Sequence, residues 1–174
     1  MKTPAVEIHG LKKSFKDVQA LDGIDLTINQ RQFFGLLGPN GAGKTTIINI
    51  LTGLVIRQEG STKIFGQDTI KDYRFTRAKI GIAAQELSID WFFPIEKLLM
   101  FHAGYYGISK NVAEEKVADI LDRLGLKEKR NTRLRQLSGG MKRRYQLAKA
   151  LVHDPDIIIP VSYTHLTLPT ILLV

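Results

Sequence analysis

Short runs of β-branched and aromatic residues, separated by glycine and aspartate turn signals, occupy the first third of the chain. The runs VEIHGL (6–11), GIDLTI (23–28) and FFGLLG (33–38) therefore predict strands. The next segment, KTTIINILTGL (44–54), follows a glycine-rich turn. It carries apolar residues at near-helical spacing, which predicts an amphipathic helix: Ile47, Ile48, Ile50, Leu51 and Leu54.

Two later runs are apolar without alternation, KIGIAA (79–84) and DIII (156–159). A continuous apolar run bounded by turn signals is typical of a strand buried on both faces, as in a parallel sheet. A shorter strand, TKIF (62–65), follows the turn RQEGS. Strands and helices that alternate in this way predict an α/β fold.

The middle of the chain predicts helices. Pro94 suits the first turn of a helix over 94–108. A second helix over 111–125 pairs a capping Asn111 with Glu114 and stops at Gly125. It carries one apolar stripe, expected to pack in the core: Val117, Ile120, Leu121 and Leu124. A last helix is predicted over 139–152.

Composition narrows the class of protein. The chain has 174 residues, of which 44% are hydrophobic, so it suits one ordinary α/β domain with a real core. It has no cysteine, which excludes a disulfide framework and fits a reducing compartment. The start MKTPAVEIHG lacks the apolar stretch of a signal peptide, so we expect a cytoplasmic protein.

The formal net charge of +8 is concentrated in KEKRNTRLR (127–135) and MKRR (141–144). Such a charge suits nucleic acid, an anionic membrane surface or bound phosphates, and such runs also occur on solvated helix faces. Charge alone therefore selects no partner.

The segment GPNGAGKT (38–45) matches the P-loop pattern, and it stands between a predicted strand and a predicted helix, as the mechanism requires. Its glycines let backbone N–H groups curl around phosphate oxygens, and the helix dipole adds to the attraction. We expect Lys44 to reach the β- and γ-phosphates of ATP and Thr45 to bind Mg²⁺. The predicted nucleotide contacts are Gly38, Pro39, Asn40, Gly41, Ala42, Gly43, Lys44, Thr45 and Thr46.

A second signal is LSGGM (137–141), in which a serine and two glycines precede a basic amphipathic helix. Alone it is weak, because a serine N-cap is commonplace. It occurs together with the P-loop, with Gln85 after a buried strand and with Phe15 near the amino end. These four features form the set of motifs that defines one family of ATPases. With these motifs the chain, from about residue 5 to Ile159, resembles the ATP-binding-cassette (ABC) ATPases, specifically the nucleotide-binding subunit of an ABC transporter.

The resemblance implies roles for single residues. Phe15 would stack on adenine, although an aromatic residue here also suits the core at a strand edge. Lys44 and Gln85 would be catalytic, and Gln85 would join Thr45 at the Mg²⁺ ion. Ser138, Gly139 and Gly140 would contact the γ-phosphate of ATP held by a second subunit. Ala84 and Met141 stand where the family more often has proline and glutamine.

The resemblance also implies an architecture and partners. The fold would be a P-loop NTPase core with an antiparallel β subdomain and a helical subdomain at about 90–140. ATP would join two such subunits head to tail, and the helical subdomain would transmit this closure to transmembrane permease subunits. The protein would then lie at the inner face of the cell membrane, and we expect no nucleic acid as a partner. The segment GGMKRR resembles the branch that contains bacterial exporters.

The chain departs from the family after DIII. The family pattern continues with Leu-Asp-Glu-Pro, whose acids hold Mg²⁺ and polarise water, whereas this chain has Pro160, Val161, Ser162 and Tyr163. Nothing after Asp156 is charged, and His165 stands in no recognisable switch context. The run VSYTHLTLP (161–169) resembles a translated transposase-type sequencing adapter, GTC TCT TAT ACA CAT CTG ACG CTG CCG.

We therefore expect residues 1–159 to form an incomplete nucleotide-binding domain that lacks the C-terminal part of its core. Residues 160–174 are interpreted as a non-native tail that suits a central strand poorly, because it is rich in threonine and contains Pro160 and Pro169. The prolines also argue against a membrane span in this uncharged stretch. The chain as given is expected to be catalytically incompetent. An alternative function is a soluble ABC-type ATPase acting on ribosomes or nucleic acid, which the basic runs favour.

Overall fold

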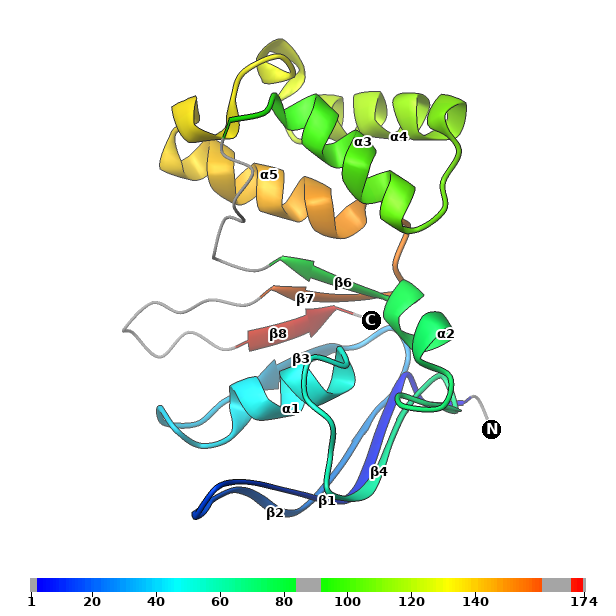
Figure 1. Cartoon of the computed structure of the whole chain (residues 1–174), viewed down its shortest axis with the longest axis vertical. Coiled ribbons are helices and arrows are strands. Elements are labelled where there is room, and N and C mark those ends of the chain that lie inside the picture. Colours follow the sequence, from blue (N-terminus) through cyan, green and yellow to red (C-terminus); the bar gives the residue numbers. More distant parts are fainter. Residues whose placement is uncertain (1–2, 84–91, 161–169, 174) are drawn as a thin grey trace. The chain divides into compact units, whose positions relative to one another are not determined.

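The computed structural model describes residues 3–83, 92–160 and 170–173, the last range as backbone only. The chain folds into two compact units (Figure 1). The N-terminal unit comprises residues 1–80 and 164–174, and the helical unit comprises residues 81–163.

An antiparallel sheet forms much of the N-terminal unit. Its strand order is β2-β1-β4-β5, with β1 paired to β2 on one side and to β4 on the other. The strands are β1 (Val6–Phe15), β2 (Val18–Ile28), β4 (Glu59–Ile64) and β5 (Gln67–Asp68). Val6 lies opposite both Ile28 and Ile64, and all three side chains are fully buried. The expected antiparallel β subdomain is confirmed.

The β1–β2 hairpin is longer than the apolar pattern predicts. Pairing continues past residue 11 to Phe15, which lies opposite Val18. The register shifts between Ile8 and Leu11 and again near Lys13, so bulges interrupt the period-2 pattern. Because backbone hydrogen bonds carry the hairpin beyond its apolar part, polarity alone underestimates the length of these strands.

Strand β3 (Phe33–Leu36) leads through the P-loop into helix α1 (Lys44–Leu51). Strand β8 (Thr170–Leu173) pairs with β3 in antiparallel register, with Phe33 opposite Leu173 and Leu36 opposite Thr170. The expectation that the tail is poorly suited to strand pairing is wrong for residues 170–173. An edge of β3 presents N–H and C=O groups that need partners, and the end of the tail satisfies them.

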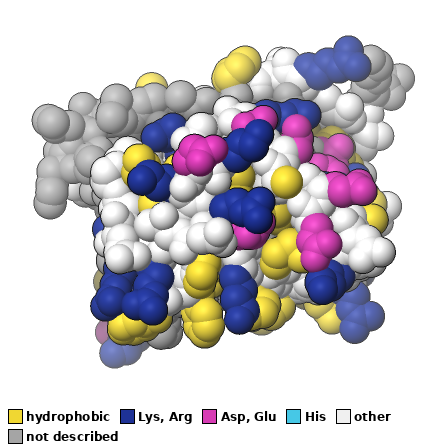
Figure 2. All heavy atoms as spheres, turned by 90° about the horizontal axis from the view of Figure 1, so that it is seen from above, with side chains coloured by type: hydrophobic (Ala, Val, Ile, Leu, Met, Phe, Trp, Pro, Cys, Tyr) yellow, Lys and Arg dark blue, Asp and Glu magenta, His cyan; other side chains and the backbone are white. Residues whose placement is uncertain are grey.

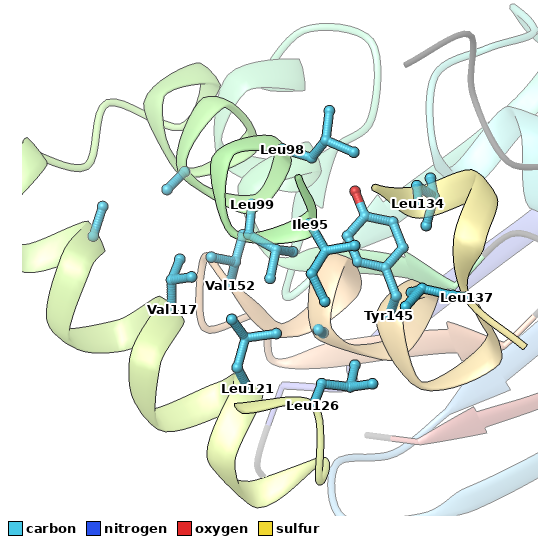
Figure 3. Packing of buried hydrophobic residues seen from close by; sticks show 13 residues of the cluster. Ile95, Leu98, Leu99, Val117, Leu121, Leu126, Leu134, Leu137, Tyr145 and Val152 are labelled. Atoms are coloured by element: carbon cyan, nitrogen blue, oxygen red, sulfur yellow. The ribbon is translucent and has the colours of Figure 1, made fainter. Parts of the chain in front are cut away.

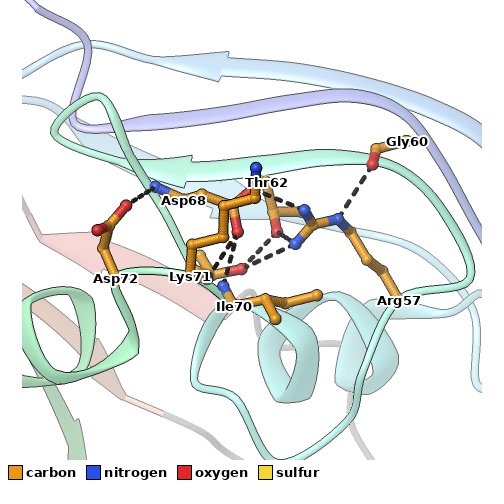
Figure 4. A network of polar contacts seen from close by, with 8 residues as sticks. Arg57, Gly60, Thr62, Asp68, Ile70, Lys71 and Asp72 are labelled. Carbon is orange, nitrogen blue, oxygen red and sulfur yellow. Dashed lines mark hydrogen bonds and ion pairs between the residues drawn. The ribbon is translucent and has the colours of Figure 1, made fainter.

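A partly buried polar network joins the α1–β4 connection to the sheet (Figure 4). The Arg57 guanidinium bonds to the Asp68 carboxylate at 2.6 Å, to the Thr62 hydroxyl at 3.1 Å and to the Gly60 carbonyl at 3.0 Å. Burial alone would raise the pKa of Asp68. The N–H groups of Lys71 and Ile70, together with the guanidinium, outweigh burial, so this pKa lies below its usual value.

Replacing Arg57 with alanine is expected to lower the free energy of unfolding by roughly 3 kcal/mol, because it leaves a largely buried carboxylate without its cation. Urea unfolding at pH 7 measures the loss. Lys12→Ala is the matched control, since the Lys12–Glu59 pair of the same sheet is exposed on both sides. Equal effects of the two substitutions would contradict the importance of burial here.

The helical unit contains three α-helices and two short 3-10 helices within its described residues. Their bounds are α3 (Ile95–Tyr105), α4 (Lys110–Arg123), η1 (Lys127–Lys129), η2 (Leu134–Gln136) and α5 (Gly139–Leu151). Strand β6 (Ile80–Ala83) enters the unit and β7 (Ile157–Pro160) leaves it. The two strands are neighbours whose arrows point the same way in Figure 1. Across residues 3–83, 92–160 and 170–173, no helix has the length and apolar character needed to cross a bilayer.

The core of the helical unit is the seam between α3, α4 and α5 (Figure 3). Val117 and Leu121 of the predicted α4 stripe are almost fully buried, and Ile120 and Leu124 pack against them, which confirms the stripe. The predicted cap at Asn111 is wrong. Helix α4 begins at Lys110, with Ser109 in the extended N-cap conformation, so Asn111 already lies in the first turn.

An aromatic cluster joins α3 to the end of α5. The His102 ring contacts those of Tyr106 and His153 edge-on, at centroid distances of 5.3 and 6.2 Å, and Tyr106 stacks on His153 at 3.7 Å. Burial, followed by the charges of Lys149 and His153, lowers the pKa of His102 to about 4. Burial likewise raises the pKa of Tyr106.

This lowered pKa predicts that stability falls in mild acid. The unfolded chain binds a proton at His102 near pH 6.5, whereas the folded chain resists protonation until about pH 4. Stability from this group is therefore intact above pH 6.5 and declines between pH 6.5 and 4. In urea unfolding at pH 7.5 and 4.5, His102→Phe should show a smaller pH-dependent loss than wild type. An unchanged loss would contradict the assignment.

Candidate functional site

The P-loop folds as its glycines require. Gly41 and Gly43 both have left-handed φ angles, 82° and 81°, which side chains disfavour. Gly43 also has no room for a side chain, because a Cβ there would lie 2.6 Å from Leu21 Cδ2 and 2.7 Å from the carbonyl oxygen of Ala20. The loop therefore packs closely on β2, and these glycines set its path.

Helix α1 presents an open N-terminus at the end of this loop. Gly43 is the N-cap residue, and no side chain in the described part of the chain caps it. The first turn contains Lys44, Thr45 and Thr46, and Thr45 is exposed. Backbone N–H groups and the positive end of the helix dipole thus meet at an accessible point, an arrangement that attracts phosphate.

Lys44 lies along the same loop. Its ammonium donates to the carbonyl oxygens of Gly38 at 2.5 Å and Pro39 at 2.7 Å, so the charge sits inside the curl of residues 38–44. The opposite side of α1 anchors it, since Ile47, Ile48, Ile50 and Leu51 are buried. The helix thereby holds the lysine and the threonine hydroxyl on one accessible edge.

Phe15 lies at the end of the β1–β2 hairpin, not in the core. Its side chain is 46% exposed, and the Lys13 ammonium lies 5.2 Å from the ring centroid. Phe15 pairs with Val18 of β2, the strand on which Gly43 packs through Ala20 and Leu21. The accessible ring and the P-loop are therefore connected through one strand of the N-terminal unit.

Ser138, Gly139 and Gly140 form the exposed start of α5 in the helical unit. The Met141 N–H donates to Ser138 Oγ at 3.3 Å, so Ser138 is the N-cap residue. A Cβ added at Gly139 or Gly140 would meet nothing within 4 Å. No crowding among the described residues of this chain explains why both positions are glycine.

Other predicted site residues lie beyond what is described. Gln85 and the segment 161–169, which follows β7, are outside the described residues. Among the residues that are described, no group of three or more acidic or histidine side chains could hold a metal ion. Thr45 is the predicted Mg²⁺ contact that the structure places, and its hydroxyl is of the hard-oxygen type that Mg²⁺ prefers.

A stripe of exposed aromatic residues on and beside α3 belongs to none of the predicted motifs. Phe93, Phe101 and Tyr105 are 42%, 49% and 85% exposed. The Lys97 ammonium lies beside two of these rings, 5.6 Å from the Phe93 centroid and 5.7 Å from the Phe101 centroid. These four residues recur every fourth position, on the face opposite buried Ile95 and Leu99. That spacing is the sequence signal that could have revealed the stripe.

The chain is similar in sequence to curated proteins. The chain is 36% identical over 159 residues to the Nod factor export ATP-binding protein I of Rhizobium sp. (strain N33), and equally to that of Paraburkholderia xenovorans (strain LB400). Each match covers 91% of this chain but 52% of the relative, so the chain spans about half the length of these curated relatives.

Solved structures share the fold. An ATP-binding subunit of an ABC transporter superposes with a TM-score of 0.77 at 21% identity, covering 90% of this chain and 65% of that one. The cbiO1 protein of Clostridium perfringens gives 0.77 at 23% identity, with 91% and 65% covered. The family model described as ABC transporter matches residues 21–160, and the chain therefore belongs to the ABC transporter family.

Proposed function

We propose that this chain is the ATP-binding part of a transport ATPase, and that the observation carrying this is the P-loop at the N-terminus of α1. The exposed N-terminus of α1 and the Lys44 ammonium together suit the β- and γ-phosphates of ATP. Thr45 would hold Mg²⁺, Gln85 would contact Mg²⁺ and the attacking water, and the exposed ring of Phe15 would stack on adenine. When bound, Mg²⁺ would neutralise phosphate charge.

A second copy of the chain completes the proposed site. Ser138, Gly139 and Gly140 present an exposed helix N-terminus with open space above both glycines. A γ-phosphate held by another copy's P-loop would approach such a surface without steric hindrance. ATP would then join two copies head to tail, and hydrolysis would release them.

The proposed membrane partner is a permease, contacted through the stripe Phe93, Lys97, Phe101 and Tyr105. Exposed aromatic residues that are grouped on one helix face mark interaction surfaces more often than scattered ones do. A cytoplasmic segment of a transmembrane subunit would cover them and place this subunit at the inner face of the cell membrane. We infer an exporter, because the curated relatives are named export ATP-binding proteins.

The alternative, an ABC-type ATPase that acts on ribosomes or nucleic acid, would favour a continuous basic surface. Figure 2 shows a face on which lysines and arginines are interspersed with acidic residues. Within the helical unit, several basic side chains are paired with acidic ones, among them Arg123–Asp119, Lys127–Asp122 and Arg130–Glu96. The mixed face favours a protein partner.

Affinity capture distinguishes these functions. We define the extended protein as a version in which β7 continues into the acidic pair of the family pattern. Captured from its source cells, it should retain the membrane protein encoded beside it and no nucleic acid. Phe101→Asp should lose that membrane protein, whereas Val112→Asp, at an exposed position of α4, should retain it. Capture of ribosomal RNA that is insensitive to Phe101→Asp would support the alternative.

The 174-residue chain itself is expected to bind Mg·ATP but to hydrolyse it at background rate. No carboxylate follows β7 in the sequence, so an attacking water would lack the acidic partner that activates it. Phosphate release by the purified chain measures this. Turnover above background that Lys44→Ala abolishes would contradict the role given to the acidic pair.

A further inference from the structure

The P-loop helix is held at its far end by an arginine from another helix. Helix α1 ends in a tight turn in which Gly53 has φ 76°, and the Gly53 N–H donates to the Ile50 carbonyl at 3.1 Å. The Gly53 carbonyl accepts a hydrogen bond from Arg77 Nη2 at 3.0 Å. A cation at this position also interacts favourably with the negative end of the helix dipole.

The absence of a side chain at Gly53 leaves room for this contact. A Cβ at Gly53 would lie 2.6 Å from Nε and 2.8 Å from Cζ of Arg77, so a side chain there would displace the guanidinium. The guanidinium carbon also lies 5.2 Å from the centroid of the Tyr73 ring, which is one turn earlier on the same helix. The planar cation thus contacts both an aromatic ring and a carbonyl oxygen, a combination that suits arginine better than lysine.

Arg77 belongs to α2 (Tyr73–Ala78), which leads directly into β6. Thr76 is fully buried and anchors α2. The Lys79 N–H donates to the Thr76 carbonyl at 3.2 Å, so the short connection between the helix and the strand is also hydrogen-bonded. Gln85 follows β6 in the sequence. The Arg77–Gly53 hydrogen bond therefore links the C-terminal end of α1 to the helix that leads into β6.

We infer that Arg77 is a positioning residue that couples phosphate binding at the N-terminus of α1 to the α2–β6 segment. The inference rests on the proposed nucleotide site. Helix α1 is short and well anchored, so phosphate binding that restrains the motion of its first turn also restrains its last turn. Because Arg77 bonds to that last turn, the motion of α2 is reduced as well. The residue itself contacts no nucleotide.

Hydrogen exchange of the full 174-residue chain, with and without Mg·ATP, tests the inference. In wild type, amides of residues 73–83 should exchange roughly fivefold more slowly when Mg·ATP is bound. Arg77→Ala should abolish this slowing and change the Kd for Mg·ATP by less than about threefold. Arg77→Lys, which keeps the charge and an ammonium that can donate to the Gly53 carbonyl, should restore part of the slowing.

Arg74→Ala is the matched control. Arg74 lies on the same helix, and its guanidinium carbon is 5.7 Å from the same Tyr73 ring, but the hydrogen bond to Gly53 belongs to Arg77. If Mg·ATP slows amide exchange in Arg77→Ala as much as in wild type, the inference is overturned. It is also overturned if Arg77→Ala and Arg74→Ala lose this slowing to the same extent. If Arg77→Ala does not fold, Arg77→Lys decides alone: wild-type slowing in this variant contradicts the inference. Wild-type chain that binds no Mg·ATP would refute the proposed nucleotide site and the inference with it.

Discussion

Replacing Lys44 with alanine is expected to weaken binding of Mg·ATP to this chain at least about tenfold, and to reduce hydrolysis by the extended protein about 10²- to 10³-fold. Lys44 is the only lysine or arginine in residues 38–46, and its ammonium lies inside the curl of the loop. Without it, the loop offers phosphate only neutral N–H groups and the helix dipole. Isothermal titration measures the affinity, and phosphate release measures hydrolysis.

Lys71→Ala is the matched control for this experiment. Lys71 is exposed in the same unit and bonds to Asp68 through its backbone N–H, which alanine keeps. The control should bind Mg·ATP as wild type does. Undiminished hydrolysis in Lys44→Ala, or equal weakening in both variants, would refute the assignment of the P-loop.

Replacing Ser138 with arginine is expected to abolish ATP-dependent dimerisation and turnover of the extended protein while leaving ATP binding by the monomer nearly intact. Ser138 is exposed at the start of α5 and belongs to the helical unit, whereas Lys44 belongs to the N-terminal unit. A long cationic side chain would occupy the open space above Gly139 and Gly140 that the partner's phosphate needs. Size-exclusion chromatography with and without ATP measures dimerisation.

Loss of the serine cap costs about 1 kcal/mol of helix stability, so a control for folding is needed. Thermal unfolding of Ser138→Arg measures this loss directly. Ser109→Arg controls for the added arginine, because Ser109 is the exposed N-cap residue of α4 in the same unit and makes no side-chain cap hydrogen bond. This control should dimerise as wild type does. If Ser138→Arg instead lost ATP binding by the monomer, the proposed role of the signature would be wrong.

Features set by local chemistry were predictable from the sequence. The P-loop requires left-handed glycines at Gly41 and Gly43, and α5 requires a cap at Ser138, so neighbouring residues alone indicate both structures. The stripe of α4 was predictable for the same reason, since burial at helical spacing leaves a periodic pattern.

Features set by distant contacts were not predictable. Helix α2 has six residues, of which only Thr76 is buried, so its sequence shows no periodic pattern of apolar residues. The hydrogen bond from Arg77 to the Gly53 carbonyl joins residues that are distant in sequence and therefore depends on the fold. The pairing of β8 with β3 reflects an edge that needs partners, not the composition of the tail. Phe15 fits both a core position and a binding position by sequence, and its exposure at the hairpin end favours the second.

The central proposal is that one nucleotide is held between Lys44 of one copy and Ser138 of another. Mixing Lys44→Ala and Ser138→Arg versions of the extended protein tests it most directly, because each mixed dimer has one composite site with both native residues and one with neither. We predict that the mixture forms ATP-dependent dimers with one nucleotide per dimer, although neither variant dimerises alone. A mixture that dimerises no better than its separate components would contradict the account.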